Sequence, residues 1–230
     1  MPGRAPAAPR CAAIVGPYLS GKTTLLESLL FATGAISRKG TAKEGNMVGD
    51  SSPEAKARKM SVECGAAVTQ YLNETWSFLD CPGSVELAQD ARNALLVCDV
   101  AIVVAEPLVD KALTLAPLFK FLDDNKIPHI LFINKMDQAS HPVRDIMAAL
   151  QGVSARPLVL RQVPIRVAGK DGDAVTGYVD VISERAYKYR PGQESDLIKM
   201  PEEVLPREQE ARTSLLERLA DFDDHLMEEL

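Results

Sequence analysis

Apolar runs and amphipathic segments alternate along the chain up to about residue 150. Short, nearly continuous apolar runs predict buried strands, whereas leucines that recur every three or four residues predict helices. By these rules we expect strands at 11–15, 65–72, 75–79, 99–105 and 128–133, a hairpin turn at Asn73-Glu74, and helices after residue 21 and at 111–124. This alternation indicates an α/β fold with a mainly parallel sheet flanked by helices.

Two regions depart from that alternation. Residues 37–59 are polar and lack a clear period, so we expect a long mobile loop there. From about residue 151 the strand-like segments become β-branched and alternating, and the tail carries one apolar helix face. We expect strands at 157–167, 177–182 and 185–190, a turn at 169–173, and a helix after Glu202 that presents Leu215, Leu219, Phe222 and Leu226.

The same pattern divides the chain into three parts. Residues 1–9 are rich in Pro and Ala and predict a disordered lead-in, residues 10–150 form a core, and residues 151–230 form a smaller second region. With 230 residues, of which 46% are apolar, the chain can bury a substantial core.

Composition narrows the function classes. No apolar stretch approaches the roughly 20 residues of a membrane span, and the start lacks a signal-peptide core, so we expect a cytoplasmic protein without a membrane partner. The net charge of −6 argues against bulk binding of nucleic acid, although Lys56, Arg58 and Lys59 form a local basic cluster. The four cysteines show no metal-binding spacing such as CxxC, so we expect reduced thiols. We also expect a monomer.

Residues 16–24, Gly-Pro-Tyr-Leu-Ser-Gly-Lys-Thr-Thr, match the phosphate-binding pattern GxxxxGK[ST]. They lie between a predicted strand and a predicted helix, the context that such a loop requires. There, backbone N–H groups converge on phosphate oxygens at a helix N-terminus. The candidate ligands are Gly16, Ser20, Gly21, Lys22, Thr23 and Thr24, with Lys22 on the β- and γ-phosphates at a solvent-facing site and the Thr23 hydroxyl on Mg²⁺.

A second motif, Asn134-Lys135-Met136-Asp137, follows the apolar run at 128–133. This NKxD form is typical of guanine recognition, because the Asp137 carboxylate accepts from the ring N–H and the exocyclic amine of guanine, whereas adenine offers no matching pair of donors. Leaving that carboxylate unpaired against the wrong base is costly. With the phosphate loop, Asn134, Lys135 and Asp137 predict GTP and GDP as ligands.

Between the two motifs, Asp80-Cys81-Pro82-Gly83 has the form DxxG. In a GTP site Asp80 would hold Mg²⁺, directly or through water, and the Gly83 N–H would lie beside the γ-phosphate. A four-residue match also fits an ordinary tight turn, but its place between the other motifs favours the nucleotide interpretation.

In order and spacing, these motifs resemble elongation factor G, and more closely the elongation-factor-G-like branch of the translational GTPases. The resemblance covers essentially everything after residue 10, including segments 30–34, 45–50, 58–62, 177–181 and 220–228. It implies a P-loop GTPase fold at 10–150, a small α+β insert subdomain with its following helix at 151–230, the ribosome as partner of the whole protein, and further domains beyond Leu230.

The resemblance also places Ser61 where the family has a threonine that binds Mg²⁺ and the γ-phosphate, so the implied metal ligands are Thr23, Ser61 and Asp80. Ser84 stands where the family has its catalytic histidine. A short hydroxyl reaches less far than an imidazole and holds no positive charge, so we expect slow hydrolysis at a centre of Lys22, Gly83 and Ser84.

Two alternatives stay open. The chain could be a GTP-dependent switch that hardly hydrolyses and regulates ribosome assembly or disassembly, which the serine at position 84 favours. A P-loop kinase or ATPase is disfavoured by the NKxD motif and by the lack of a kinase-type acceptor site.

Overall fold

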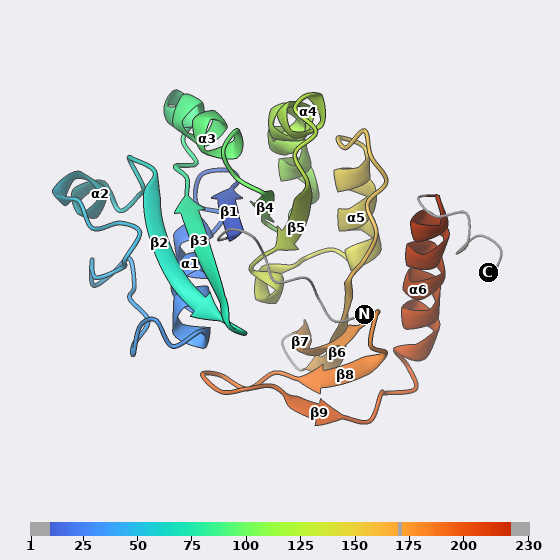
Figure 1. The fold of residues 1–230 in the computed structure, drawn as a ribbon. Coiled ribbons are helices and arrows are strands. Elements are labelled where there is room, and N and C mark those ends of the chain that lie inside the picture. The colour runs from blue at the N-terminus through green and yellow to red at the C-terminus, as the bar shows by residue number, and fades with distance from the viewer. Residues whose placement is uncertain (1–9, 170–171, 222–230) are drawn as a thin grey trace. The chain divides into compact units, whose positions relative to one another are not determined.

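A computed structural model describes residues 10–169 and 172–221, and the chain forms two compact units, Met1–Ala155 and Arg156–Leu230 (Figure 1). The predicted lead-in at 1–9 and the tip of the predicted turn at 169–173 lie outside the described residues. Within the described ranges no helix is long and apolar enough to cross a membrane.

The first unit is built on a five-stranded sheet with the strand order β2-β3-β1-β4-β5. Its strands are β1 (Arg10–Val15), β2 (Gly65–Tyr71), β3 (Glu74–Asp80), β4 (Val100–Ala105) and β5 (His129–Ile133). All neighbours pair in parallel except β2 and β3. The α/β class with a mainly parallel sheet is therefore confirmed. Because the parallel strands end at one edge, that edge collects the loops that carry the predicted site.

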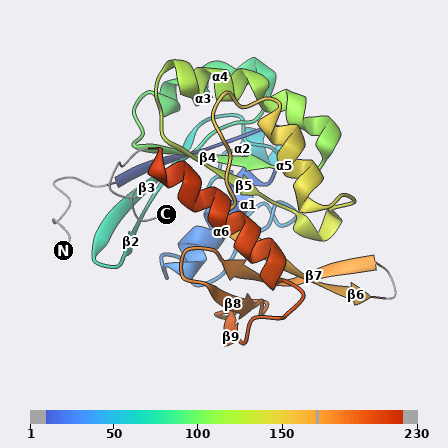
Figure 2. The ribbon, with the colours of Figure 1, turned by 90° about the vertical axis from the view of Figure 1, so that its right-hand side faces the viewer.

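Helices cover both faces of this sheet. The helices of this unit are α1 (Lys22–Ala32), α3 (Ala88–Leu95), α4 (Ala116–Asp124) and α5 (Val143–Gln151), together with the short α2 (Pro53–Arg58) in the segment between α1 and β2. Figures 1 and 2 show α1 on one side of the sheet and α3 and α4 on the other. The core beneath α1 combines apolar side chains of β1, β3, β4 and α1: Ala12, Ile14, Leu26, Leu30, Phe78 and Val104. This packing fixes the first turn of α1 at the end of β1.

Local predictions in the first unit fail where turn and cap chemistry decide the structure. The turn of the hairpin consists of Leu72 and Asn73, one residue earlier than expected. Both residues have positive φ, as a two-residue turn between twisted strands requires. The predicted loop at 37–59 contains α2, whose start is capped by Ser52. The predicted helix at 111–124 is a 3₁₀-helix up to Leu115 and becomes α-helical only at α4, while α3 and α5 were not predicted.

The second unit is an antiparallel sheet and a helix. Its strands are β6 (Gln162–Gly169), β7 (Gly172–Asp180), β8 (Arg185–Lys188) and β9 (Asp196–Ile198), in sequential order, followed by α6 (Leu205–Ala220). The buried core joins the sheet to this helix through Val163, Ile165, Val179, Val181, Ala186, Val204 and Ala211. The strand β9 was not predicted.

The buried face of α6 differs from the predicted one. Leu215 packs against the core, but Leu219 is exposed, and Phe222 and Leu226 lie outside the described residues. The inward positions are instead Glu208 and Ala211, which precede Leu215 at helical spacing. Because these inward positions hold a small and a polar residue, the pattern of large apolar residues does not indicate the buried face of α6.

Candidate functional site

The phosphate loop joins β1 to α1, and its backbone is shaped by glycine. Gly21 has φ of 96°, and a Cβ there would lie 2.2 Å from Nδ2 of Asn134. Among the described residues no side chain caps α1, and its first turn carries no acidic residue. The N–H groups of that turn have no intrahelical acceptors, so they remain suited to an anionic ligand.

Lys22 is the first residue of α1, and its side chain is buried, with a relative exposure of 6%. Its ammonium donates a hydrogen bond of 3.0 Å to the carbonyl of Pro17. Burial lowers the pKa of Lys22, and Asp80 partly opposes that shift. The expectation that Lys22 faces solvent is therefore wrong: the charge is held inside the loop, where water screens it less than at the surface.

Thr23, Ser61 and Asp80 come together from three segments. The Thr23 and Ser61 hydroxyl oxygens lie 3.1 Å apart. Both carboxylate oxygens of Asp80, at the end of β3, are buried and have no hydrogen-bond partner of normal geometry among the described residues. Burial raises the pKa of Asp80 to about 6, although Thr23 and Lys22 lie close enough to oppose the shift.

This group of oxygens fits a hard cation. A buried carboxylate without a partner is costly unless a ligand completes it. Mg²⁺ prefers oxygen ligands and is usually held by one or two carboxylates together with water and phosphate oxygens. The residues present therefore fit Mg²⁺ that arrives with a nucleotide, with one carboxylate and two hydroxyls to hold it.

Gly83 and Ser84 follow Asp80 on the same loop. A Cβ at Gly83 would lie 2.3 Å from Nζ of Lys22 and 2.8 Å from the backbone of Pro17, so this position admits only glycine beside the phosphate loop. The half-buried Ser84 instead turns its hydroxyl to Oε2 of Glu86, two residues further on. That hydrogen bond lowers the pKa of Glu86. The Ser84 hydroxyl is therefore already hydrogen-bonded within the protein.

The guanine motif is tied directly to the phosphate loop. Asn134 continues β5, and its Nδ2 donates 2.9 Å to the carbonyl of Ser20. Lys135, with φ of 55°, donates 2.7 Å to the carbonyl of Leu19. These two bonds join segments far apart in sequence and hold them at one sheet edge. Asp137 follows with an exposed carboxylate.

The remaining predicted phosphate ligands, Gly16, Ser20 and Thr24, differ in burial. Gly16 follows β1 at the start of the loop. Ser20 is fully buried, and its Oγ has no partner among the described residues. Thr24 lies in the first turn of α1 with an exposed side chain. Ser20 is therefore enclosed within the loop, whereas Thr24 is open to solvent.

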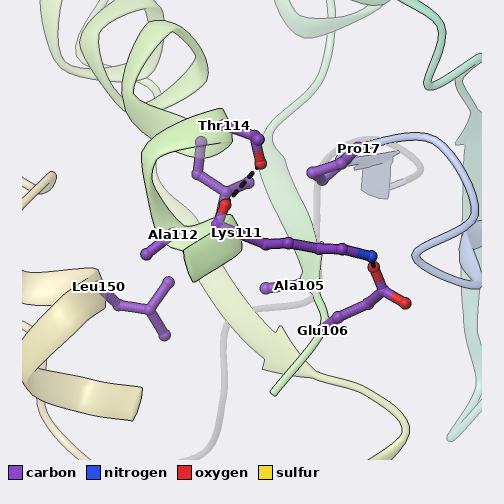
Figure 3. A pocket seen from close by; sticks show the side chains of 8 residues that line it. Pro17, Ala105, Glu106, Lys111, Ala112, Thr114 and Leu150 are labelled. Carbon is purple, nitrogen blue, oxygen red and sulfur yellow. Dashed lines mark hydrogen bonds and ion pairs between the residues drawn. The ribbon is translucent and has the colours of Figure 1, made fainter. Parts of the chain in front are cut away.

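The sequence analysis missed Glu106, which follows β4. Its carboxylate accepts 2.8 Å from Lys135 and 2.5 Å from Lys111, and its side chain is only 9% exposed. Figure 3 shows Lys111 reaching across to Glu106 beside Pro17. Glu106 thus holds the side chain of Lys135, which in turn donates to the phosphate loop at Leu19. Only the position after a buried strand could have indicated its role.

Glu27 was missed as well. It lies within α1, is almost fully buried, and accepts from the N–H groups of Gly40, at 2.8 Å, and Val48. It thereby anchors the segment before Ser61 to the helix that begins at the phosphate loop. A glutamate in a helix carries no local sign of such a contact, because its partners come from a distant loop.

Known proteins resemble this chain along almost its whole length. Residues 9–218 match the family of the elongation factor Tu GTP binding domain. The chain is 54% identical to an elongation factor G-like protein of Synechocystis over 96% of its length, and 26% identical to elongation factor G 1 of Geobacter sulfurreducens over 96%. A crystal structure of a Thermus thermophilus protein superimposes with a TM-score of 0.80 at 28% identity, covering 97% of the chain.

The match covers only part of those proteins. The chain spans 32% of the length of both the Synechocystis and the Geobacter relatives and 33% of the Thermus chain. The shared part contains the sheet edge on which the phosphate loop, Asp80 and the guanine motif meet.

Proposed function

Since the chain belongs to the elongation factor Tu GTP-binding domain family, and within it to the translational GTPases of the elongation factor G type, we propose that it binds GTP and GDP with Mg²⁺ and serves an elongation-factor-G-like protein that acts on the ribosome. The pair of hydrogen bonds from Asn134 and Lys135 to the carbonyls of Ser20 and Leu19 carries this proposal, because it holds a guanine-type motif beside a phosphate-type loop. A cytoplasmic, monomeric protein is part of the proposal.

In this proposal the phosphates lie at the N-terminus of α1. The free N–H groups of its first turn bind phosphate oxygens, and Lys22 turns from the Pro17 carbonyl to the β- and γ-phosphates. The buried position of Lys22 limits its screening by water, which strengthens the contact.

The base is read at the other end of the site. Asp137 accepts from the two donors of guanine, while Asn134 and Lys135 hold the loop against the phosphate loop. ATP is rejected because adenine would leave the carboxylate without its donors.

Thr23, Ser61 and Asp80 are the proposed ligands of Mg²⁺. When bound with the nucleotide, the ion would neutralise part of the phosphate charge. The three protein groups orient it from two hydroxyls and one carboxylate, and Glu27 keeps the loop before Ser61 close to α1.

We propose that hydrolysis is slow at this centre. Gly83 lies close against Lys22 and the backbone of Pro17, but Ser84 is short, uncharged and hydrogen-bonded to Glu86. It offers little to orient an attacking water, so the step relies on Lys22 and the loop amides.

Nucleotide choice is tested by competition. Labelled GDP bound to the 230-residue chain is displaced with GTP, GDP or ATP in Mg²⁺. We expect GTP and GDP to compete and ATP to fail, and Asp137→Asn to weaken guanine binding, while Asp145→Asn, an exposed control with the same charge change, leaves it intact. Equal competition by ATP would show that the guanine assignment is wrong.

Hydrolysis is tested by single-turnover assays with and without ribosomes. We expect slow turnover for the unchanged protein, no further loss for Ser84→Ala, and an increase for Ser84→His of up to about 10²–10⁴-fold, the usual contribution of a positioned acid or base. Turnover by the unchanged protein at rates typical of the family would contradict slow hydrolysis and leave GTP binding untouched.

A further inference from the structure

Two thiols lie beside the candidate site without a role in nucleotide binding. Cys64 precedes β2 and Cys81 follows β3, and their Sγ atoms are 3.9 Å apart. Gly65 and Asp80 pair across these antiparallel strands, so the cysteines occupy the next opposed positions. Opposed residues of antiparallel strands have Cα atoms about 4.5–5.5 Å apart, which is within the span of a disulfide.

The two thiols differ in their exposure to solvent. Cys64 is exposed, whereas Cys81 is fully buried. Cys64 is therefore the thiol that a small oxidant in solution reaches first, and Cys81 is the neighbour in place to resolve the oxidised sulfur.

The positions of the pair connect two parts of the candidate site. Cys64 lies three residues after Ser61, and Cys81 lies between Asp80 and the Pro82-Gly83 turn. A bond between the sulfurs would tie the segment that carries Ser61 to the loop that carries Asp80 and Gly83. It would do so in the arrangement in which Ser61 contacts Thr23.

We propose that hydrogen peroxide oxidises Cys64 and Cys81 to a reversible disulfide. This bond fixes the segment that carries Ser61 relative to the loop that carries Asp80 and Gly83. The Cys64 thiolate attacks one peroxide oxygen and the O–O bond breaks, which gives a sulfenic acid and a hydroxide that takes up the proton lost by the thiol. Cys81 Sγ then attacks Cys64 Sγ, and the hydroxyl group leaves with the Cys81 proton as water. Two thiols lose two electrons in total, and one peroxide becomes two waters.

The chain contains its own control pair. Cys11 and Cys98 are both partly buried, and burial raises the pKa of each. They should react more slowly than Cys64, and replacing both with serine leaves the Cys64–Cys81 pair intact.

Peptide mapping tests the bond without reference to nucleotides. The reduced 230-residue chain is treated with hydrogen peroxide without denaturant, free thiols are alkylated, and peptides are analysed by mass spectrometry. We expect one cross-link, Cys64–Cys81, that dithiothreitol reverses, that persists in the Cys11→Ser/Cys98→Ser variant and that disappears in Cys64→Ser. Sulfinic acid at Cys64 without a cross-link, another pairing, or only intermolecular links would overturn the proposal.

The effect on the loops rests on the proposed GTP binding and is measured separately. We expect oxidation to raise the ratio of GTP to GDP affinity by about 5- to 150-fold, the usual range of coupling between two sites, in the Cys11→Ser/Cys98→Ser variant as well. Peroxide should leave that ratio unchanged in Cys64→Ser. An unchanged ratio in cross-linked protein would overturn the coupling, whereas a cross-link in protein that binds no guanine nucleotide in either state would overturn the proposed function and leave the disulfide standing.

Discussion

Two aspartates that end strands, one in each unit, have opposite surroundings. Asp80 closes β3 with both carboxylate oxygens buried and without a hydrogen-bond partner of normal geometry among the described residues, and burial raises its pKa to about 6. Asp180 closes β7 and accepts from Arg161 at 2.5 Å and from the N–H groups of Ile182 and Ser183 at 2.9 Å each. The Arg161 bond lowers its pKa to about 2.

The difference supports the proposed binding role of Asp80 and a structural role of Asp180. The chain satisfies Asp180 by itself, so this residue stabilises the turn between β7 and β8. Within the described part of the chain, the Asp80 carboxylate has no well-formed hydrogen bond, which is costly to stability unless a ligand completes the group. Burial without partners, more than burial alone, therefore marks the candidate site.

The largest effect is expected at the cation nearest Asp80. Lys22→Ala should weaken GTP and GDP binding by more than about 100-fold, because one charged group is lost from two phosphates and charged hydrogen bonds contribute about 1.5–3 kcal/mol each. Equilibrium binding of a fluorescent guanine nucleotide measures it. Lys120→Ala, at an exposed side chain, is the control. Normal GTP binding by Lys22→Ala would show that the loop at residues 16–24 does not bind the phosphates.

Asp80→Asn tests the first half of the comparison. We expect Mg²⁺-dependent nucleotide affinity to fall by about 10- to 100-fold, because a charged metal ligand is replaced by a neutral one. Without nucleotide and metal, the variant should be no less stable than the unchanged protein at neutral pH, since a buried charge is removed. Titrations with Mg²⁺ and with chelator, together with denaturant unfolding, measure both effects. A large loss of stability would show that Asp80 is structural.

Asp180→Asn tests the second half. It should lower the free energy of unfolding at pH 7 by about 1–2 kcal/mol, because charged hydrogen bonds near the surface are lost, and leave nucleotide affinity unchanged. The folded pKa lies below the unfolded value, so this stabilisation is complete above about pH 4 and is lost as the pH falls toward about 2. Denaturant unfolding of both proteins at pH 7, 4 and 3 should show the difference shrinking with acid. A difference that is constant with pH would contradict the ion pair.

The smallest effect is expected at Glu106. Glu106→Gln should raise the rate of GDP release by about 2- to 10-fold, because Lys135 keeps its bond to Leu19 but loses its charged partner, a change of about 0.5–1.5 kcal/mol. Stopped-flow displacement of a fluorescent GDP measures the rate. Lys111→Met removes the other lysine and should have less effect, since Lys111 does not reach the guanine motif. An unchanged rate in Glu106→Gln would show that this carboxylate does not position Lys135.

Sequence patterns predicted those features that depend on neighbouring residues. The period of apolar residues predicted the α/β sheet, and contiguous motifs predicted the segments at Lys22, Asp80 and Asp137. Contacts between distant segments could not be predicted in this way. Glu27 and Glu106 occupy unremarkable positions in the chain, and their partners lie in loops that only folding brings near. The shifted hairpin turn and the buried face of α6 were missed for a related reason, because backbone conformation and packing outweigh the local preference of single side chains.

By itself the sequence determined the chemistry available to this protein: a glycine-shaped loop with one lysine, a carboxylate after an apolar strand, and a motif suited to guanine. Their order along the chain determined that they meet at one edge of a parallel sheet. Only the tertiary structure decided that Lys22 is enclosed and that Cys64 and Cys81 lie 3.9 Å apart. It also decided that, among the described residues, the Asp80 carboxylate has no hydrogen-bond partner of normal geometry whereas Asp180 accepts three hydrogen bonds. Burial and partnership depend on which segments pack together, and that packing is a property of the whole folded chain.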